Sequence, residues 1–136
     1  MNNYLLDTNI LIQCFRKATG FLELMASLAR DDALYISAVT RLEVVRGMQE
    51  REREETYNLL NSIETLNVSA EIADKAGELI RSWRKQGATL EDMDALIAAT
   101  ALHHRLALVT ANARHFPMPD LVVFQANDKG KLTLRE

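Results

Sequence analysis

The sequence of 136 residues has few of the features that would identify a function at once. Cys14 is the only cysteine, so no disulfide can form within the chain, and a reducing compartment such as the cytoplasm is expected. No apolar run is long enough to cross a membrane. The glycine patterns that bind nucleoside triphosphates or dinucleotides do not occur, nor does the G-x-S-x-G pattern of serine hydrolases. These absences disfavour several large classes of enzymes and membrane proteins.

The composition is otherwise that of an ordinary globular domain. Apolar residues make up 48% and charged residues 26% of the chain. The length predicts one domain over residues 1–136 with one core, and the last ten or so residues are free to form a tail. The net charge of −3 does not by itself suggest binding to nucleic acid. A nuclease that binds metal through carboxylates concentrates negative charge locally, however, so this charge does not exclude a nucleic-acid substrate.

Apolar periodicity predicts that strands and helices alternate along the chain. Strands are expected at residues 4–6, 34–36, 65–68, 106–109 and 121–124. Helices are expected at residues 21–28, at 40–48 and 51–62, after an N-cap at Ser69 as far as Gly87, and at 90–104, where Thr89 and Asp92 resemble a capping box. Strands separated by helices imply parallel βαβ units. The predicted fold class is therefore an α/β sandwich, with a mostly parallel central sheet of about five strands and helices on both faces.

Acidic and small polar residues follow the predicted strands. Asp7-Thr8-Asn9 follows the first strand, Ser37 ends the second, and Thr110-Ala111-Asn112 follows the strand at 106–109. Glu43 and Asp94 are expected on the first turns of their helices. In open parallel sheets, ligands bind beyond the carboxyl ends of the strands. We therefore expect these side chains to converge on one edge of the sheet.

Each of these residues also has a purely structural interpretation. Asp7 could cap a turn through its own backbone. Glu43 could complete a capping box with Thr40, and Asp94 could be favoured by the helix dipole. Asn112 could occupy a turn position. The functional interpretation depends on their convergence, because three neighbouring carboxylates repel one another unless they are protonated or bridged by cations. Mg²⁺ or Mn²⁺, with oxygen ligands, suits such a site.

Four segments of the chain resemble the four sequence blocks of the PIN-domain family, in order and in spacing. They are LLDTNIL at residues 5–11, SAVTRLE at 37–43, DALIAATA at 94–101 and LVTAN at 108–112. The resemblance covers nearly the whole chain. The size of the protein and the strings LDTNIL and DALIAATAL are similar to those of VapC-type toxins, the ribonucleases of type II toxin–antitoxin systems.

The resemblance implies a three-layer PIN-like fold and an acidic site. By it, Asp7, Glu43 and Asp94 are the acidic residues of the site, and Asn112 occupies the fourth position, where many relatives have aspartate. An acidic residue is also common where this chain has His115. These two differences leave open whether the site holds one metal ion or two.

The resemblance also implies a metal-dependent endoribonuclease that hydrolyses phosphodiester bonds in structured RNA, commonly tRNA or rRNA. Asp7 and Asp94 would hold one Mg²⁺ or Mn²⁺, with Asn112 at or near it, while Glu43 orients the attacking water or holds a second cation. The side chains expected to position these ligands are Thr8, Asn9, Ser37 and Thr110.

Two kinds of protein partner follow from the resemblance. One is a second copy of the chain in a homodimer, and the other is a small antitoxin protein that covers the acidic cleft. Apolar residues in excess of a five-stranded core, at Met48, Leu59, Leu60 and Trp83, point to a helical dimer surface. The antitoxin is expected beside the segment Arg41–Glu55.

This function has two alternatives. A phosphoacceptor receiver domain has a similar sheet, but it expects paired acidic residues after its first strand and a lysine after a late strand. This chain has Thr8-Asn9 and Ala111-Asn112 at those places, which disfavours that class. The alternative that stays open is a catalytically silent PIN module that serves as an RNA- or protein-binding scaffold, because Asn112 and His115 replace acidic residues. An RNA-cleavage assay with and without Mg²⁺ separates it from the enzyme.

Overall fold

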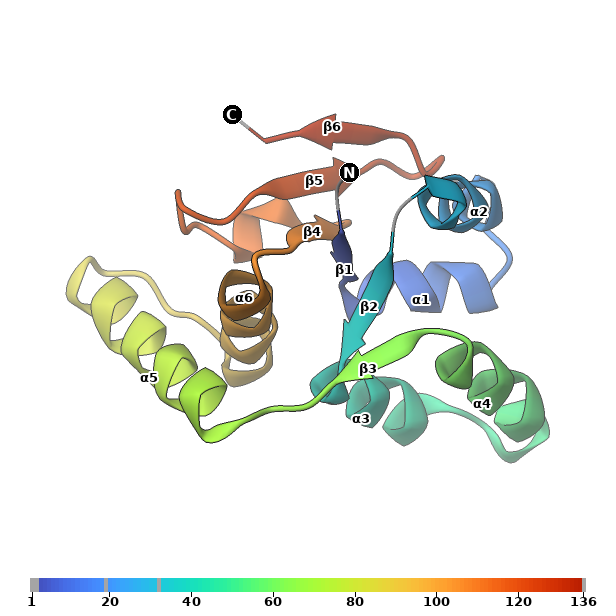
Figure 1. Cartoon of the computed structure of the whole chain (residues 1–136), viewed down its shortest axis with the longest axis horizontal. Coiled ribbons are helices and arrows are strands. Elements are labelled where there is room, and N and C mark those ends of the chain that lie inside the picture. The colour runs from blue at the N-terminus through green and yellow to red at the C-terminus, as the bar shows by residue number, and fades with distance from the viewer. Residues whose placement is uncertain (1–2, 19, 32, 136) are drawn as a thin grey trace.

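The computed structural model describes residues 3–18, 20–31 and 33–135 (Figure 1). Its strands are β1 (Tyr4–Leu6), β2 (Leu34–Ser37), β3 (Glu64–Leu66), β4 (Ala107–Thr110), β5 (Val123–Ala126) and β6 (Leu132–Leu134). Its α-helices are α1 (Thr8–Phe15), α2 (Phe21–Asp31), α3 (Ala38–Gly47), α4 (Arg53–Asn61), α5 (Ala70–Lys85) and α6 (Asp92–His104). Two short 3-10 helices, η1 (Glu50–Glu52) and η2 (Ala113–His115), complete the described elements.

The strands form one sheet in the order β3-β2-β1-β4-β5-β6. All neighbouring pairs are parallel except β5 and β6, which are antiparallel. The first strand of the chain lies inside the sheet, where Leu5 pairs with Tyr35 on one side and with Leu108 on the other. The predicted α/β class and mostly parallel sheet are confirmed, and the sheet has six strands among the described residues rather than about five.

The last residues of the chain, where the sequence allowed a tail, form the sixth strand. Strand β6 pairs with β5 after a turn in which Asn127 Oδ1 accepts hydrogen bonds from the backbone N–H groups of Lys129 and Lys131. The guanidinium of Arg135 then donates to the carbonyls of Phe116, Met118 and Leu121. A three-residue edge strand carries too weak an apolar pattern to be predicted. Its position depends on this turn and on the three hydrogen bonds of Arg135, which we call the Arg135 clamp.

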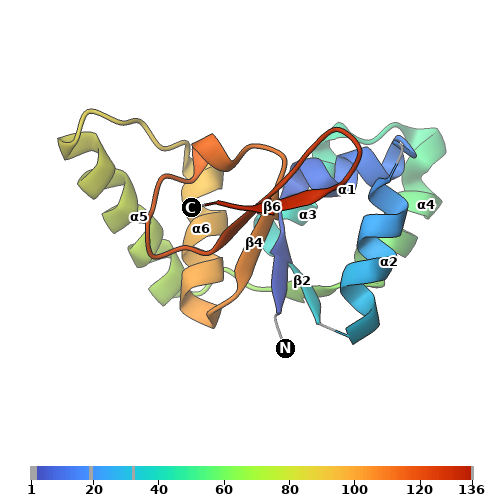
Figure 2. The ribbon, with the colours of Figure 1, turned by 90° about the horizontal axis from the view of Figure 1, so that it is seen from above.

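Helices cover both faces of the sheet and enclose two hydrophobic cores (Figures 1 and 2). Helices α5 and α6 pack on one face over residues such as Leu5 and Leu108, while α1, α2 and α4 pack on the other over residues such as Leu6 and Val109. Consecutive residues of β1 and of β4 therefore point into opposite cores, as the alternation of side chains along a strand requires. This double burial explains why the strands read as continuous apolar runs.

Side-chain caps at the ends of strands start several helices. Asp7 Oδ1 accepts from the backbone N–H of Thr8 at 2.8 Å and begins α1, for which the sequence pattern gave no prediction. Ser37 accepts from the backbone of α3, and Ser69 caps α5 as predicted. Gly87 follows α5 with φ +83°, the left-handed conformation expected of a glycine after a helix. The polar edge of the sheet is thus also where helices begin.

Two predicted helix starts were wrong by one turn or less. Helix α3 begins at Ala38, so Glu43 lies on its second turn and forms no capping box with Thr40. Helix α6 begins at Asp92 with Glu91 as its N-cap, so the capping box expected at Thr89 does not form. Helix α3 starts before Thr40 because Ser37, the last residue of β2, caps it by accepting from the backbone N–H of Val39.

Three of the four apolar residues that predicted a dimer surface pack inside the chain, and the fourth, Met48, lines a hollow beside Glu43. Leu60 is fully buried, and Leu59 and Trp83 are partly buried against the two cores. Helix α1, which was not among the predicted elements, contributes side chains to the core that buries Leu59 and Leu60. The homodimer therefore stays a prediction of the family resemblance alone. No helix within the described part of the chain is long and apolar enough to cross a membrane.

Candidate active site at the carboxyl edge of the sheet

Asp7 is the buried centre of the polar edge. It follows β1 directly, its backbone N–H donates to Val109 O at 2.9 Å, and only 6% of its surface is exposed. Thr110 Oγ1 donates to Asp7 Oδ2 at 2.7 Å, and Asn9 Nδ2 lies 3.3 Å from the same oxygen. Thr110 is the last residue of β4 and Asn9 is in the first turn of α1, and the parallel pairing of β1 with β4 brings Thr110 to this carboxylate.

Glu43 joins the same edge from helix α3. Thr8 Oγ1 donates to Glu43 Oε1 at 2.6 Å and lies 3.1 Å from Thr40 Oγ1. Because one hydroxyl has one proton, Thr8 gives it to the carboxylate and can accept from Thr40. Thr40 is fully buried one turn before Glu43, so this pair of threonines fixes the approach of α3 to α1.

Asp94 comes from the first turn of α6, as predicted, and meets a residue that the sequence left without a role. His115 Nδ1, on η2, lies 3.4 Å from Asp94 Oδ2. The Asp94 side chain is 22% exposed and that of His115 is 55% exposed, so this pair lies at the solvent side of the edge.

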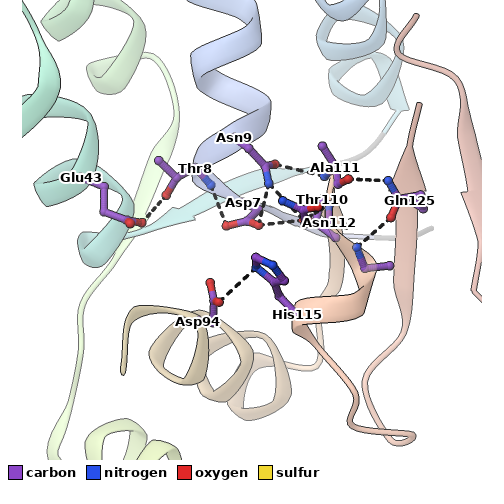
Figure 3. A network of polar contacts seen from close by, with 11 residues as sticks. Asp7, Thr8, Asn9, Glu43, Asp94, Thr110, Ala111, Asn112, His115 and Gln125 are labelled. Atoms are coloured by element: carbon purple, nitrogen blue, oxygen red, sulfur yellow. Dashed lines mark hydrogen bonds and ion pairs between the residues drawn. The ribbon is translucent and has the colours of Figure 1, made fainter. Parts of the chain in front are cut away.

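The three carboxyl groups are close enough to influence one another (Figure 3). Burial raises the pKa of Asp7 to about 6, hydrogen bonds from Thr110 and Thr8 oppose this, and the charges of Asp94 and Glu43 add to it. Burial also raises the pKa of Asp94, with His115 lowering it and Glu43 raising it. The structure thus brings together Asp7, Glu43 and Asp94 from three separate elements.

Asn112 lies in a loop that is held on both sides of it. Gln125 Nε2 donates to Ala111 O at 2.5 Å, and Gln125 Oε1 accepts from the backbone N–H of Ala113 at 2.7 Å. Asn9 Oδ1 accepts from the backbone N–H of Ala111 at 3.1 Å. Asn112 itself is exposed, and its backbone N–H donates to Thr110 Oγ1 at 3.0 Å. The sequence did not single out Gln125, and the pairing of Thr110 with Gln125 across β4 and β5 explains its position.

The four residues predicted to position the carboxylates act in different ways. Thr8 contacts Glu43, while Asn9 and Thr110 contact Asp7. Ser37 is fully buried, and its hydroxyl oxygen accepts from the backbone N–H of Val39, so it acts on Glu43 through the start of α3.

The edge opens into two hollows instead of the one cleft that convergence alone suggests. Glu43 lines a hollow of about 490 Å³ between α1, α3 and η1, together with Arg16, Met48 and Glu52. Asp94 lines another of about 330 Å³, together with Arg114 and residues beside η2. Asp7 is too deeply buried to line either, and its carboxylate interacts electrostatically with both acidic neighbours.

The donor chemistry of the edge fits a hard divalent cation. Carboxylate and amide oxygens are the ligands that Mg²⁺ prefers, and buried Asp7 has neighbours whose negative charges a cation would offset. Among the described residues, no three His, Cys, Asp or Glu side chains are already placed as ligands of one ion. Mg²⁺ commonly binds through one or two carboxylates and keeps several waters, so it does not require three protein ligands that are already in place.

The fold and this carboxylate cluster define an α/β domain with an acidic site beyond the carboxyl ends of its strands. The PIN domain model matches residues 4–119, and the chain belongs to that family. It is 36% identical over 114 residues to ribonuclease VapC10 of Mycobacterium tuberculosis. The matched stretch covers 84% of this chain and 86% of that protein.

Solved structures agree with this family. A toxin–antitoxin complex from Klebsiella pneumoniae contains a chain that is 31% identical, with a TM-score of 0.73 over 88% of this chain and 95% of that chain. VapBC2 from Rickettsia felis, bound to a DNA fragment from its promoter, has a TM-score of 0.78 over 89% of this chain and 96% of that chain, at 24% identity. The second likeness bears on the fold alone.

Proposed function

We propose that this chain is a Mg²⁺-dependent endoribonuclease and the toxin of a toxin–antitoxin pair. The observation that carries the proposal is the convergence of Asp7, Glu43 and Asp94 on one edge, with the pKa of buried Asp7 raised to about 6. A purely structural cap does not need three mutually repelling carboxylates. The ribonuclease name of the similar VapC10 and the toxin–antitoxin complex from Klebsiella pneumoniae support the same function.

The residues have distinct roles in this proposal. Asp7 and Asp94 would hold Mg²⁺ or Mn²⁺, with the amide oxygen of Asn112 beside them. When bound, the cation supplies neutralisation of the phosphate charge and acidifies water at neutral pH. Glu43, held by Thr8 at 2.6 Å, orients the attacking water and accepts its proton, or holds a second cation. Water attacks phosphorus and gives a proton to Glu43, the bond between phosphorus and one ribose oxygen breaks, and that oxygen takes a proton from solvent water.

The substrate and the assembly remain parts of the proposal. We propose structured RNA, tRNA or rRNA, as the substrate, a homodimer as the resting assembly and the cytoplasm as the compartment. A single buried Cys14, whose pKa burial raises to about 11, is compatible with that compartment because its thiol stays protonated and unreactive.

The antitoxin would bind in the hollow beside Glu43. Part of its lining comes from the predicted segment Arg41–Glu55 and part from α1, and it combines apolar Met48 with charged Arg16 and Glu52. An amphipathic segment fits such a lining, and an arginine from it would reach the carboxylates, since a guanidinium forks well onto them. Such a cation would occupy the place of the metal and block cleavage.

The deciding experiment is cleavage of total tRNA and rRNA by the purified chain, with Mg²⁺ and with EDTA. The proposal requires discrete products that appear with Mg²⁺ and disappear with EDTA. Tight RNA binding without cleavage, under both conditions and with Mn²⁺, would instead establish the catalytically silent scaffold that the Asn112 and His115 positions leave open.

A further inference from the structure

The pocket of about 330 Å³ beside Asp94 has no role in the chemistry described above. It lies between the loop that precedes α6 and the segment that contains η2. The side chains that matter for its chemistry are Thr89, Leu90, Asp94, Arg114, His115 and Pro117. Asp94 is the one carboxylate of the cluster among its lining residues. The pocket therefore adjoins the candidate metal site without being part of it.

The two basic residues of this pocket stand next to each other on η2. Arg114 is exposed and makes no hydrogen bond or ion pair with any residue that the structure describes. His115 is 55% exposed and faces Asp94 at 3.4 Å. Opposite them, Glu91 and Asp94 belong to the start of α6. One wall is therefore basic and the other acidic, with an uncommitted guanidinium on the basic wall.

This lining suits one ribonucleotide. A guanidinium binds phosphate through two parallel hydrogen bonds. Leu90 and Pro117 offer an apolar surface to a base or ribose, and an exposed histidine ring is a stacking partner for RNA bases. Glu91 can accept hydrogen bonds from amino or hydroxyl groups of the nucleotide. The volume lies near the lower end of the range for small-ligand pockets, about 300 to 1,000 Å³, and leaves no room for a duplex.

We propose that this pocket binds the RNA nucleotide next to the scissile phosphate, with Arg114 holding the phosphate of that nucleotide. The inference rests on the proposed ribonuclease function and adds a substrate-binding residue to it. A metal held by Asp7 and Asp94 would lie at the scissile phosphate, and Arg114 would then bind the neighbouring phosphate of the RNA. The pocket thereby provides a position at which the enzyme can distinguish one base from another.

The test measures RNA binding separately from RNA cleavage. In an Asp7→Asn background, chosen to prevent cleavage, a fluorescein-labelled single-stranded RNA of mixed sequence is titrated at several salt concentrations. Arg114→Ala is compared with Arg30→Ala, a matched variant of an exposed arginine in the last turn of α2, at the opposite edge of the sheet. Thr89→Tyr fills the pocket without removing a charge, since Thr89 is exposed.

Arg114→Ala should weaken binding about tenfold. The plot of log association constant against log salt concentration should become shallower by about 0.7, as expected for one lost phosphate contact on a single strand. Thr89→Tyr should weaken binding with an unchanged slope, and Arg30→Ala should change neither. Equal affinities and slopes for Arg114→Ala and Arg30→Ala would overturn the proposal, as would unaltered binding by Thr89→Tyr or no RNA binding at all. If the unmodified chain cleaves RNA while Arg114 proves irrelevant, only the pocket assignment fails and the proposed function stands.

Discussion

Thr8 Oγ1 donates a hydrogen bond of 2.6 Å to Glu43 Oε1 and so joins the first residue of α1 to the second turn of α3. Thr8 follows the buried Asp7 directly, and its backbone N–H donates to the Asp7 carboxylate at 2.8 Å. One threonine therefore sets the positions of two of the three acidic side chains. A small change at Thr8 should be felt at both.

Thr8→Val removes the hydroxyl and keeps the shape of the buried side chain. RNA cleavage should fall about 10- to 100-fold, the usual cost of losing a partner that orients a site residue. The measurement is initial cleavage rate with saturating Mg²⁺, and Thr8→Ser, which retains the hydroxyl, is the control. Equal rates for the valine and serine variants would show that the contact with Glu43 is not needed.

Asp94→Asn should abolish metal-dependent cleavage and leave the fold intact. The substitution removes a ligand charge from a partly exposed side chain, and it relieves the repulsion with Glu43 and Glu91 that helps raise the pKa of Asp94. Thermal melting in EDTA should therefore occur at an equal or higher temperature than for the unmodified protein. Cleavage at the normal rate would remove Asp94 from the proposed site.

Gln125→Leu should release the loop around Asn112. The variant loses the bonds to Ala111 O and from the Ala113 N–H, so the Ala113 amide should exchange its hydrogen faster and cleavage should slow about tenfold. Gln86→Leu, at an exposed glutamine after α5, is the matched control. Faster exchange across the whole protein would point to general destabilisation instead.

The raised pKa of Asp7 predicts how stability depends on pH when metal is absent. The pKa of Asp7 is about 6 in the folded state, against an ordinary value of 3.8, so between these two pH values the native protein binds more protons than the unfolded chain. This group therefore stabilises the fold less as pH rises, and above pH 6 it costs up to about 3 kcal/mol. The measurement is the free energy of unfolding by urea in EDTA, from about pH 4 to pH 7. As pH rises over this range, Asp7→Asn should become more stable relative to the unmodified protein. A difference that does not vary with pH would contradict the shifted pKa.

Arg135 should matter for stability although it lies next to the end of the chain. Its guanidinium donates to the carbonyls of Phe116, Met118 and Leu121, so Arg135→Ala leaves these groups without that partner. The free energy of unfolding should fall by about 1 to 3 kcal/mol. Arg53→Ala removes an exposed, solvent-screened ion pair with Glu50, so the free energy of unfolding should fall by much less than in Arg135→Ala. Similar losses in the two variants would argue against the Arg135 clamp.

The sequence predicted the parts of the fold that carry a strong local pattern. The buried strands near Leu5, Ile36 and Leu108 are continuous apolar runs, and Ser69 and Gly87 mark the ends of α5 by their own chemistry. Helix α1 was missed because it has only eight residues and begins with polar residues that read as a loop. Strand β6 was missed because its existence depends on pairing with β5 and not on its own three residues.

The candidate site divides in the same way. Asp7 and Thr110 could be placed because the ends of parallel strands share an edge, and strand ends can be read from sequence. Gln125 could not, because a glutamine in a half-exposed strand gains its role only when β5 pairs with β4 in register. The contact of His115 with Asp94 likewise depends on how η2 turns back over α6.

The inner position of β1 has a consequence for the order in which the protein is made. Its neighbour β4 is about 100 residues later in the chain, and Asp7 obtains its bond from Thr110 only when β4 is in place. A ribosome therefore synthesises Asp7 long before Thr110, the residue that positions its carboxylate. The carboxylate site is therefore incomplete until nearly all of the chain has been synthesised. For the toxin proposed above, that interval is the time in which a cell can supply the antitoxin.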